Sequence, residues 1–251
     1  MKALCLLLLL AAAISAQIKK PELSAVKAPF TESLQALVVT TGDWSDTKGK
    51  GLLYERKDTR SKWKAVGKEF EVVVGRSGLG IDIEGAWRED VAHLPKEEGD
   101  GRSPAGMFPL TFAFGNSDSI RSKLSYQKLT EFTECVDDMN SSFYNRVAHR
   151  LQVGNFDWKS SEKMASITPE YDLGVFVAYN SYPAIKGNGS CIFLHIWKDA
   201  NTPTSGCTAM DRADLERIVK WLDPKKNPYL IQLPKKSYSA YSESWNLPKH
   251  D

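Results

Sequence analysis

Hydrophobic positions along this chain fall into short runs of strand length rather than into long helical stripes. Most runs are rich in β-branched or aromatic residues and end at glycine or at a cluster of turn residues, which is typical of strands. Strands at such close spacing favour a sandwich or a barrel over alternating strand–helix units. The sequence therefore predicts a mainly β protein with strands at residues 33–40, 51–56, 63–66, 70–75, 171–180, 191–197 and 229–233, the second and third forming a hairpin.

One segment has the period of a helix instead. Asp211 is placed to cap its first turn, Asp214 adds a negative charge there, and Pro224 ends it. Its apolar positions recur three and four residues apart, which places them on one helical face. The pattern predicts a helix between Asp211 and Pro224 whose buried face consists of Leu215, Ile218, Val219 and Leu222.

Two stretches between these elements lack periodicity. Residues 98–110 contain Gly99, Gly101 and Gly106, which suit a ligand-facing loop, although a plain surface loop has the same composition. Residues 116–170 are polar and irregular, and an insertion of this length usually covers a site or forms a lid. The tail from residue 234 is polar and contains tyrosines. Because no repeat or long linker separates these parts, we expect one domain over residues 17–251.

The first 16 residues have the layout of a secretory signal. Lys2 precedes a leucine-rich core, and small residues ending at Ala16 follow it. Such a stretch is too short to span a bilayer as a helix, although a retained membrane anchor is the alternative. No later segment is apolar enough to cross a membrane. We therefore expect a signal peptide at residues 1–16 and a secreted or periplasmic protein without a stable membrane anchor.

The charge pattern argues against a nucleic-acid partner. The 33 Lys and Arg residues and 31 Asp and Glu residues are interspersed, and the net charge is only +2. The sequence contains no phosphate-binding loop, dinucleotide fingerprint or Gly-Xaa-Ser-Xaa-Gly elbow. Its histidines and cysteines also lack the ordered spacing of a zinc site. We expect neither a metal nor a cofactor.

Export changes the interpretation of the cysteines. Loss of Cys5 with the signal leaves Cys135, Cys191 and Cys207, an odd number in an oxidising compartment. The simplest arrangement is a Cys135–Cys191 disulfide with Cys207 free for chemistry. Three buried reduced thiols are the alternative.

The free cysteine lies close in sequence to a histidine. Alternation in strand 191–197 puts His195 on the same face as Cys191, Phe193 and Trp197. A histidine on such a strand is often only a buried core residue. Cys207, however, stands in a small-residue loop, and a thiolate beside an imidazole is a common nucleophile. The spacing alone is compatible with either interpretation.

A family resemblance favours the interpretation of Cys207 and His195 as a catalytic pair. His195, followed by Thr204-Ser-Gly-Cys207, resembles the active-site motif of the L,D-transpeptidase catalytic (YkuD-type) family, which has a histidine, a spacer and then Ser/Thr-His-Gly-Cys. Residues 101–108, Gly-Arg-Ser-Pro-Ala-Gly-Met-Phe, are similar to another segment of that family. The middle block resembles a secreted branch of these proteins, in residues 135–138, 144–145 and 157–164. The resemblance covers roughly residues 33–234 and implies an L,D-transpeptidase-like β-sandwich or barrel with a few short helices and one long insertion.

The resemblance also implies acyl transfer on peptidoglycan stem peptides. Cys207 would form a thioester, and His195 would act as general base and acid. Backbone N–H groups around Gly206 and Cys207 would stabilise the oxyanion, with the Ser205 hydroxyl as a helper. The resemblance further implies acylation of Cys207 by carbapenem-type β-lactams. Other expected substrate-binding residues are Arg102, Trp197 and Thr204.

Departures from the family pattern leave the outcome of the reaction open. Ser205 replaces the usual histidine before Gly-Cys, Ala209 replaces an arginine, and the spacer after His195 is shorter than usual. A carboxypeptidase or endopeptidase would use the same pair with water as the acceptor. A non-catalytic peptidoglycan-binding protein with this fold is the third interpretation.

Overall fold

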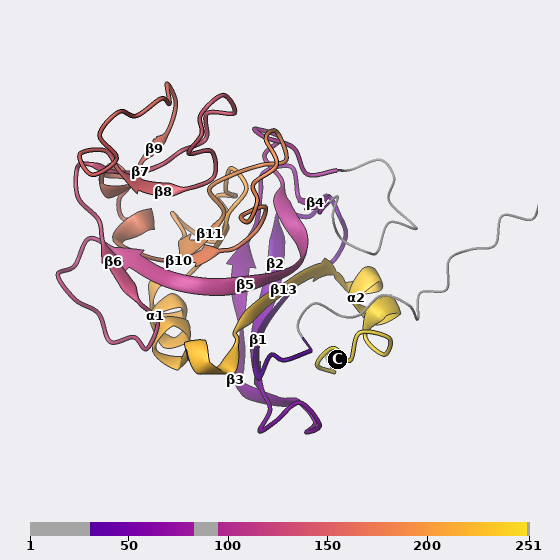
Figure 1. The fold of residues 1–251 in the computed structure, drawn as a ribbon. Helices are drawn as coiled ribbons and strands as arrows, with labels where there is room; N and C mark the ends of the chain where they lie inside the picture. Colours follow the sequence, from indigo (N-terminus) through magenta and orange to yellow (C-terminus); the bar gives the residue numbers. More distant parts are fainter. Residues whose placement is uncertain (1–30, 83–94, 250–251) are drawn as a thin grey trace, which may run out of the picture.

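The main element of the fold is a β-sheet that closes on itself. The computed structural model describes residues 31–82 and 95–249. The order of strands is β10-β11-β12-β3-β2-β1-β13-β5-β4, with β6 beside β5, and β10 also pairs with β5. These pairings form a barrel-like sheet with α1 and α2 outside it (Figure 1). The predicted mainly β sandwich or barrel with a few short helices is confirmed.

The strands within the described residues are β1 (Gln35–Thr41), β2 (Lys48–Glu55), β3 (Lys64–Val73), β4 (Leu79–Ile81), β5 (Ser103–Gly115), β6 (Tyr126–Lys128), β7 (Thr133–Cys135), β8 (Val147–His149), β9 (Glu162–Lys163), β10 (Leu173–Val177), β11 (Phe193–Ile196), β12 (Thr208–Met210) and β13 (Tyr229–Pro234). The helices are α1 (Arg212–Trp221), α2 (Lys235–Tyr241) and the short 3₁₀ turns η2 (Met164–Ser166), η3 (Glu170–Asp172) and η4 (Pro224–Lys226).

The centre of the sheet joins the two ends of the described chain. All seven residues of β1 are buried, and β1 lies between β2, with which it is antiparallel, and β13, with which it is parallel. A strand buried on both faces is continuously apolar rather than alternating, which is the pattern of residues 36–39. Pairing of the first strand with the last therefore places both ends of the described chain in the middle of the sheet.

The predicted hairpin forms, but one prediction about its second strand is wrong. Residues 63–66 and 70–75 were expected to form two strands, whereas β3 runs through both regions as one. Its pairing with β2 shifts register between Gly51 and Leu53, and Gly67 has a positive φ of 77°. A bulge of this kind lets one strand bend without ending.

The glycine-bearing stretch from residue 98 is only partly a loop. From Ser103 onwards it forms β5, the 13-residue strand that crosses the whole sheet in Figure 1. Two prolines are tolerated in this strand: Pro104 pairs with Gly80 of the short strand β4, and Pro109 lies where β5 passes from β13 to β10. The expectation of a loop over all of 98–110 is therefore wrong.

Helix α1 forms as predicted. The Asp211 carboxylate accepts a hydrogen bond from the Ala213 N–H at 2.8 Å, and Leu215, Ile218 and Val219 are buried. The tail after β13, by contrast, was expected only to be polar and to contain tyrosines, and no helix was predicted in it. It forms α2, and Tyr238, Tyr241 and Trp245 join the core because their rings bring apolar area to an otherwise polar segment.

The insertion folds as a small unit of its own on one side of the barrel. Strands β8, β7 and β9 form a separate three-stranded sheet, drawn above β10 and β6 in Figure 1. A disulfide joins Cys135 in β7 to Cys191 just before β11. The predicted pairing is confirmed, and Cys207 is the free cysteine of the described residues. The insertion is thus tied to the strand that carries His195.

The predicted signal at residues 1–16, including Cys5, lies outside the described residues. In the ranges that the structure describes, no helix has the length and apolar character needed to cross a membrane.

Candidate active site

Two neighbouring strands bring the predicted nucleophile and base to one cavity. Strands β11 and β12 run parallel, with His195 in register with Ala209. Cys207 immediately precedes β12, so it lies near His195 although 12 residues separate them in sequence. Both side chains line a cavity of about 470 Å³, together with four other predicted site residues, Trp197, Thr204, Ser205 and Gly206.

The alternation predicted for strand β11 is present. Ile192, Leu194 and Ile196 belong to the main core inside the barrel. Cys191 and Phe193 instead join Cys207 in a second buried cluster beneath the cavity. The strand thus separates a face that packs into the main core from the face that carries the candidate chemistry.

Cys207 is a buried thiol with defined partners. It is only 7% exposed. Its Sγ accepts the Phe193 N–H at 3.3 Å and donates to the Cys191 carbonyl at 3.4 Å. Burial raises the pKa of the Cys207 thiol well above its ordinary value, and the Glu162 charge raises it further. Hydrogen bonds from Phe193 and Tyr171 act in the opposite direction. The thiol is therefore protonated at neutral pH in the free protein.

His195 is held in one tautomer. Its Nδ1 lies 2.7 Å from the Ile196 carbonyl oxygen, so Nδ1 carries the proton and Nε2 is left to accept one. The Tyr171 ring packs edge-on against the imidazole, with ring centroids 5.4 Å apart. Burial lowers the pKa of His195. Across the described part of the chain, no hydrogen bond joins the imidazole to the Cys207 thiol.

Hydrogen bonds within the loop before Cys207 engage two groups, the Thr204 hydroxyl and the Gly206 N–H, that were predicted to face substrate. The Thr204 Oγ1 donates to the Cys207 carbonyl at 2.6 Å and accepts the Gly206 N–H at 3.1 Å. The Gly206 N–H was expected to stabilise an oxyanion, and Thr204 to bind substrate, but both are engaged with the loop itself. Gly206 has a φ of 152°, a conformation that favours glycine.

Ser103 of β5 holds the same loop in place through two hydrogen bonds. The Ser103 Oγ donates to the Cys207 carbonyl at 2.8 Å and accepts the Gly75 N–H at 2.8 Å. Ser103 is fully buried. The sequence marks it only as part of the 101–108 segment, and its role was not predicted, because the pairing spans 104 residues.

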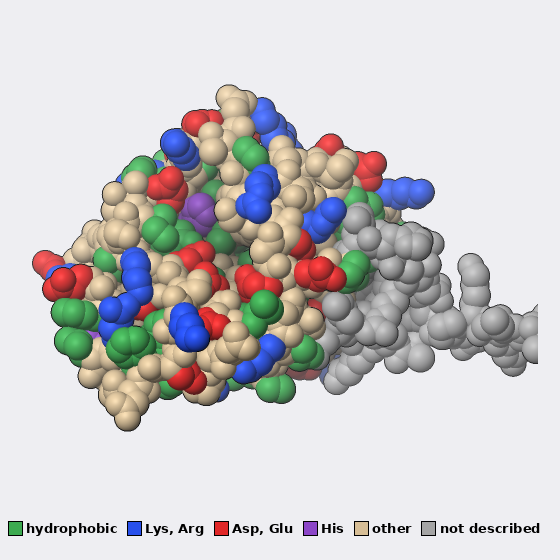
Figure 2. Space-filling view, turned by 90° about the horizontal axis from the view of Figure 1, so that it is seen from above, with side chains coloured by type: hydrophobic (Ala, Val, Ile, Leu, Met, Phe, Trp, Pro, Cys, Tyr) green, Lys and Arg blue, Asp and Glu red, His purple; other side chains and the backbone are tan. Residues whose placement is uncertain are grey.

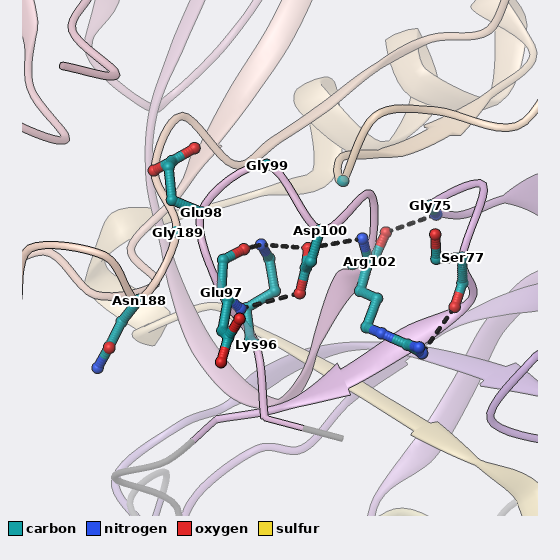
Figure 3. A network of polar contacts seen from close by, with 12 residues as sticks. Gly75, Ser77, Lys96, Glu97, Glu98, Gly99, Asp100, Arg102, Asn188 and Gly189 are labelled. Atoms are coloured by element: carbon teal, nitrogen blue, oxygen red, sulfur yellow. Dashed lines mark hydrogen bonds and ion pairs between the residues drawn. The ribbon is translucent and has the colours of Figure 1, made fainter. Parts of the chain in front are cut away.

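Arg102 does not reach the cavity. Its guanidinium donates to the backbone carbonyls of Ser77 at 2.8 Å and Leu79 at 3.2 Å, and Figure 3 shows it extended toward Ser77. Arg102 is thus not among the residues that line this cavity, and its expected role in substrate binding stays a prediction. Arg76 and Lys96 line the cavity in its place. Lys96 is buried and pairs with Asp100 at 2.8 Å, whereas Arg76 is exposed.

Two acid–base residues of the site were missed by the sequence analysis. Glu162 comes from β9 of the insertion and Tyr171 from η3, and both line the cavity. The Tyr171 hydroxyl donates to the Glu162 Oε2 at 2.7 Å. Burial raises the pKa of Glu162 to about 7, although the Tyr171 hydrogen bond opposes the rise. The expectation that the insertion covers a site is thus supported by the residues that it contributes.

The surface around the site is mixed in charge. Figure 2 shows Lys and Arg side chains interspersed with Asp and Glu over the upper face of the molecule. The cavity itself combines Arg76, Lys96 and Lys198 with Glu98, Asp137 and Glu170. Among the described residues, no three His, Cys, Asp or Glu side chains form a cluster suited to a metal ion.

Comparisons with known proteins place this chain in a family through one family model. A comparison with curated proteins finds no match. One solved structure, the helical cell shape determining protein Pgp2 from Campylobacter jejuni, is 14% identical, with a TM-score of 0.36 over 80% of this chain and 47% of that chain. This chain therefore spans less than half of that structure's length. The family model of the L,D-transpeptidase catalytic domain, YkuD, matches residues 46–231, well over half of the sequence. The chain belongs to the YkuD family of L,D-transpeptidase catalytic domains.

Proposed function

We propose that this protein is an exported L,D-transpeptidase that transfers acyl groups of peptidoglycan stem peptides through a thioester on Cys207. The observation that carries the proposal is that Cys207, the free cysteine of the described residues, shares one cavity with His195. Membership of the L,D-transpeptidase catalytic-domain family supports a cell-wall peptide as the substrate. Export is proposed from the signal-like residues 1–16, and residues 17–251 are proposed to act as one domain.

The chemistry begins with the loss of the thiol proton. His195 Nε2 is the imidazole nitrogen that can take this proton, because Nδ1 is engaged with the Ile196 carbonyl. The Cys207 sulfur then attacks the carbonyl carbon of the peptide bond before a terminal D-residue. The C–N bond breaks, His195 returns the proton to the leaving amine, and the acyl group stays on sulfur. An amine from a second stem then attacks the thioester carbonyl; the new C–N bond forms, the C–S bond breaks, and the amine proton passes through His195 to the Cys207 sulfur.

Substrate binding follows from the groups that face the cavity. Arg76 offers an exposed guanidinium whose only described hydrogen bond, to the Gly99 carbonyl, is long at 3.5 Å. A guanidinium of this kind suits the carboxylate of the departing D-residue. Trp197 is half-buried and provides an apolar wall. Ser205 is exposed on the loop, where its hydroxyl is available to help stabilise the oxyanion, because the Gly206 N–H is already bound to Thr204.

The test is incubation with a purified disaccharide tetrapeptide, with and without an added D-amino acid, followed by product masses. A transpeptidase makes the product in which the added D-amino acid replaces the terminal residue, and Cys207→Ala does not. Formation of only the tripeptide, with no exchange product, would replace the proposal by hydrolysis. Absence of any product, together with retention on insoluble peptidoglycan, would replace it by a binding role.

A β-lactam provides a second probe of the same sulfur. A carbapenem that acylates Cys207 adds its full mass to the intact protein, and peptide mapping places the adduct. The adduct should be absent from Cys207→Ala. An adduct that persists in this variant would show that another residue is the nucleophile.

A further inference from the structure

Two buried oxygen atoms at the cavity have no partner within the described part of the chain. Ser190 lines the cavity and is only 8% exposed. Its Oγ makes no hydrogen bond to any described residue, and the same holds for the buried Oδ1 of Asp137, which also lines the cavity. Buried polar atoms are nearly always hydrogen-bonded, because an unsatisfied one destabilises the folded protein. This pair therefore indicates a ligand that supplies the missing hydrogen bonds.

The fold holds these two residues on adjacent segments. The disulfide joins the end of β7 to Cys191. Asn145 adds a second link, because its N–H donates to the Val136 carbonyl at 2.8 Å and its Oδ1 accepts the Cys191 N–H at 2.9 Å. Asp137 follows Val136 and Ser190 precedes Cys191, so both unpartnered oxygens lie next to the same link.

These segments also reach the nucleophile. The carbonyl of Cys191, the residue after Ser190, accepts the Cys207 thiol at 3.4 Å. Asp137, Ser190 and Cys207 line one cavity of about 470 Å³. A peptide bound at Cys207 can therefore place one of its polar groups against Asp137 and Ser190.

The charge around this part of the cavity favours a cation. Glu98 and Glu162 line the cavity beside Asp137, and we call these side chains the three carboxylates. The Tyr144 hydroxyl donates to the Glu98 Oε2 at 2.5 Å and accepts the Gly189 N–H at 3.1 Å, so Glu98 lies beside Gly189 (Figure 3). Burial raises the pKa of Glu162, and the charges of Asp137 and Glu98 raise it further. The three carboxylates thus repel one another, and a bound cation would relieve this repulsion.

The Lys and Arg side chains of the cavity leave the three carboxylates unpaired. Lys96 is paired with Asp100 at 2.8 Å, and Arg76 and Lys198 are exposed. Among the ion pairs of the described residues, none includes any of the three carboxylates. The positive charge therefore has to come from the ligand.

We propose that Asp137 and Ser190 bind a primary ammonium group of the peptide substrate, with Glu98 and Glu162 adding negative charge around it. An ionised carboxylate only accepts hydrogen bonds, so the ligand must donate to the Asp137 Oδ1. An ammonium group is compact, has three N–H donors and carries the charge that the three carboxylates need. A hydroxyl would supply a donor without the charge. The inference rests on the proposed function in taking a peptide with a free amine as the ligand.

The first test is calorimetric binding of a disaccharide tetrapeptide to Cys207→Ala, which lacks the reactive sulfur. The peptide is used with its side-chain amine free and after acetylation of this amine, which removes the charge. If the acyl donor supplies the ammonium group, acetylation should weaken binding about tenfold, the size expected for a hydrogen bond to a charged group. Asp137→Asn or Ser190→Ala, added to Cys207→Ala, should weaken binding of the free amine and reduce this preference.

The second test concerns the acyl acceptor in the active protein. If the acceptor supplies the ammonium group, acetylation of the donor should leave binding unchanged. Asp137→Asn should then raise the D-amino acid concentration that gives half-maximal exchange by about tenfold. Asp118→Asn and Ser239→Ala are matched controls, because both side chains are exposed, and they should behave like the parent protein in both tests.

Equal binding of the two peptides to Cys207→Ala, together with an unchanged half-maximal concentration in Asp137→Asn, would overturn the inference. Ser190→Ala gives the same two readouts if Asp137→Asn fails to fold. A variant that weakens binding of the free and the acetylated peptide by the same factor, with exchange at an unchanged half-maximal concentration, would also overturn it, because a merely structural role has that effect.

Binding to Cys207→Ala needs no acyl transfer, so the first test is independent of the exchange assay. A preference for the free amine that Asp137→Asn removes, in a protein that makes no exchange product, would contradict the proposed function alone. Exchange that depends on Cys207, with neither effect of Asp137→Asn, would contradict this inference alone.

Discussion

The hydrogen bonds of Ser103 lead to a quantitative prediction about the nucleophile loop. Ser103 is fully buried, and its hydroxyl joins the Cys207 carbonyl to the Gly75 N–H. In Ser103→Ala the Cys207 carbonyl keeps its bond from Thr204, but no other described hydrogen bond satisfies the Gly75 N–H. The loss combines one hydrogen bond, worth about 1 kcal/mol, with a buried unsatisfied donor, which costs about 1–3 kcal/mol.

The free energy of unfolding should therefore fall by about 3 kcal/mol. For a chain of this size, such a loss lowers the melting temperature by about 6–12 °C. Thermal unfolding followed by circular dichroism measures this shift, and Cys207 alkylation shows whether the loop has moved. The matched control is Ser239→Ala, because the exposed Ser239 hydroxyl donates only to the Lys235 carbonyl within α2, at 3.0 Å. That variant should stay within about 0.5 kcal/mol of the wild type. If the two variants melt at the same temperature, Ser103 does not hold the loop.

Three further predictions concern the surroundings of the site. Replacement of Cys135 and Cys191 together by alanine should lower the free energy of unfolding by about 4 kcal/mol, because the disulfide closes a loop with a sequence separation of 56. Urea unfolding measures this loss, and an unchanged urea midpoint would contradict the prediction. The folded pKa of Glu162, about 7, lies above its ordinary value of 4.5, so the stability that Glu162 contributes is complete below pH 4.5 and is lost as the pH rises through 7. Relative to wild type, the free energy of unfolding of Glu162→Gln should therefore rise by about 3 kcal/mol between pH 4.5 and pH 8, and a difference independent of pH would refute the assignment. Asp211→Ala should lower the free energy of unfolding by about 1 kcal/mol because it removes the N-cap of α1, whereas Asp211→Asn should lower it little. Equal losses of stability for the two variants in thermal melts would count against a capping role for Asp211.

Local signals in the sequence were sufficient for the elements whose interactions are local. Helix α1 could be predicted because its cap at Asp211 and its apolar period lie within a dozen residues. The two faces of β11 follow from alternation alone. The disulfide could be predicted because an odd number of cysteines, one of them in the motif, leaves Cys135 and Cys191 to pair.

What could not be predicted depends on pairing between distant segments. Strand β5 contains turn-forming glycines and prolines, and only its several partner strands reveal why they are tolerated. Glu162 stands in a polar block without periodicity, and its approach to Cys207 depends on the pairing of β9 with β7. Arg102 was expected to bind substrate because of its charge, but its guanidinium is held by two backbone carbonyls. Charge alone does not indicate which of several neighbouring Lys and Arg side chains faces a cavity.

An acyl group carried on Cys207 as a thioester would test the proposed mechanism most directly. The measurement is the intact mass of the protein quenched in acid during turnover of a tetrapeptide substrate, followed by peptide mapping. We predict a mass increase equal to the mass of the substrate less that of the released D-amino acid, located on the peptide that contains Cys207 and absent from Cys207→Ala. Exchange that continues undiminished in Cys207→Ala, or an acyl group found on another residue, would contradict the mechanism.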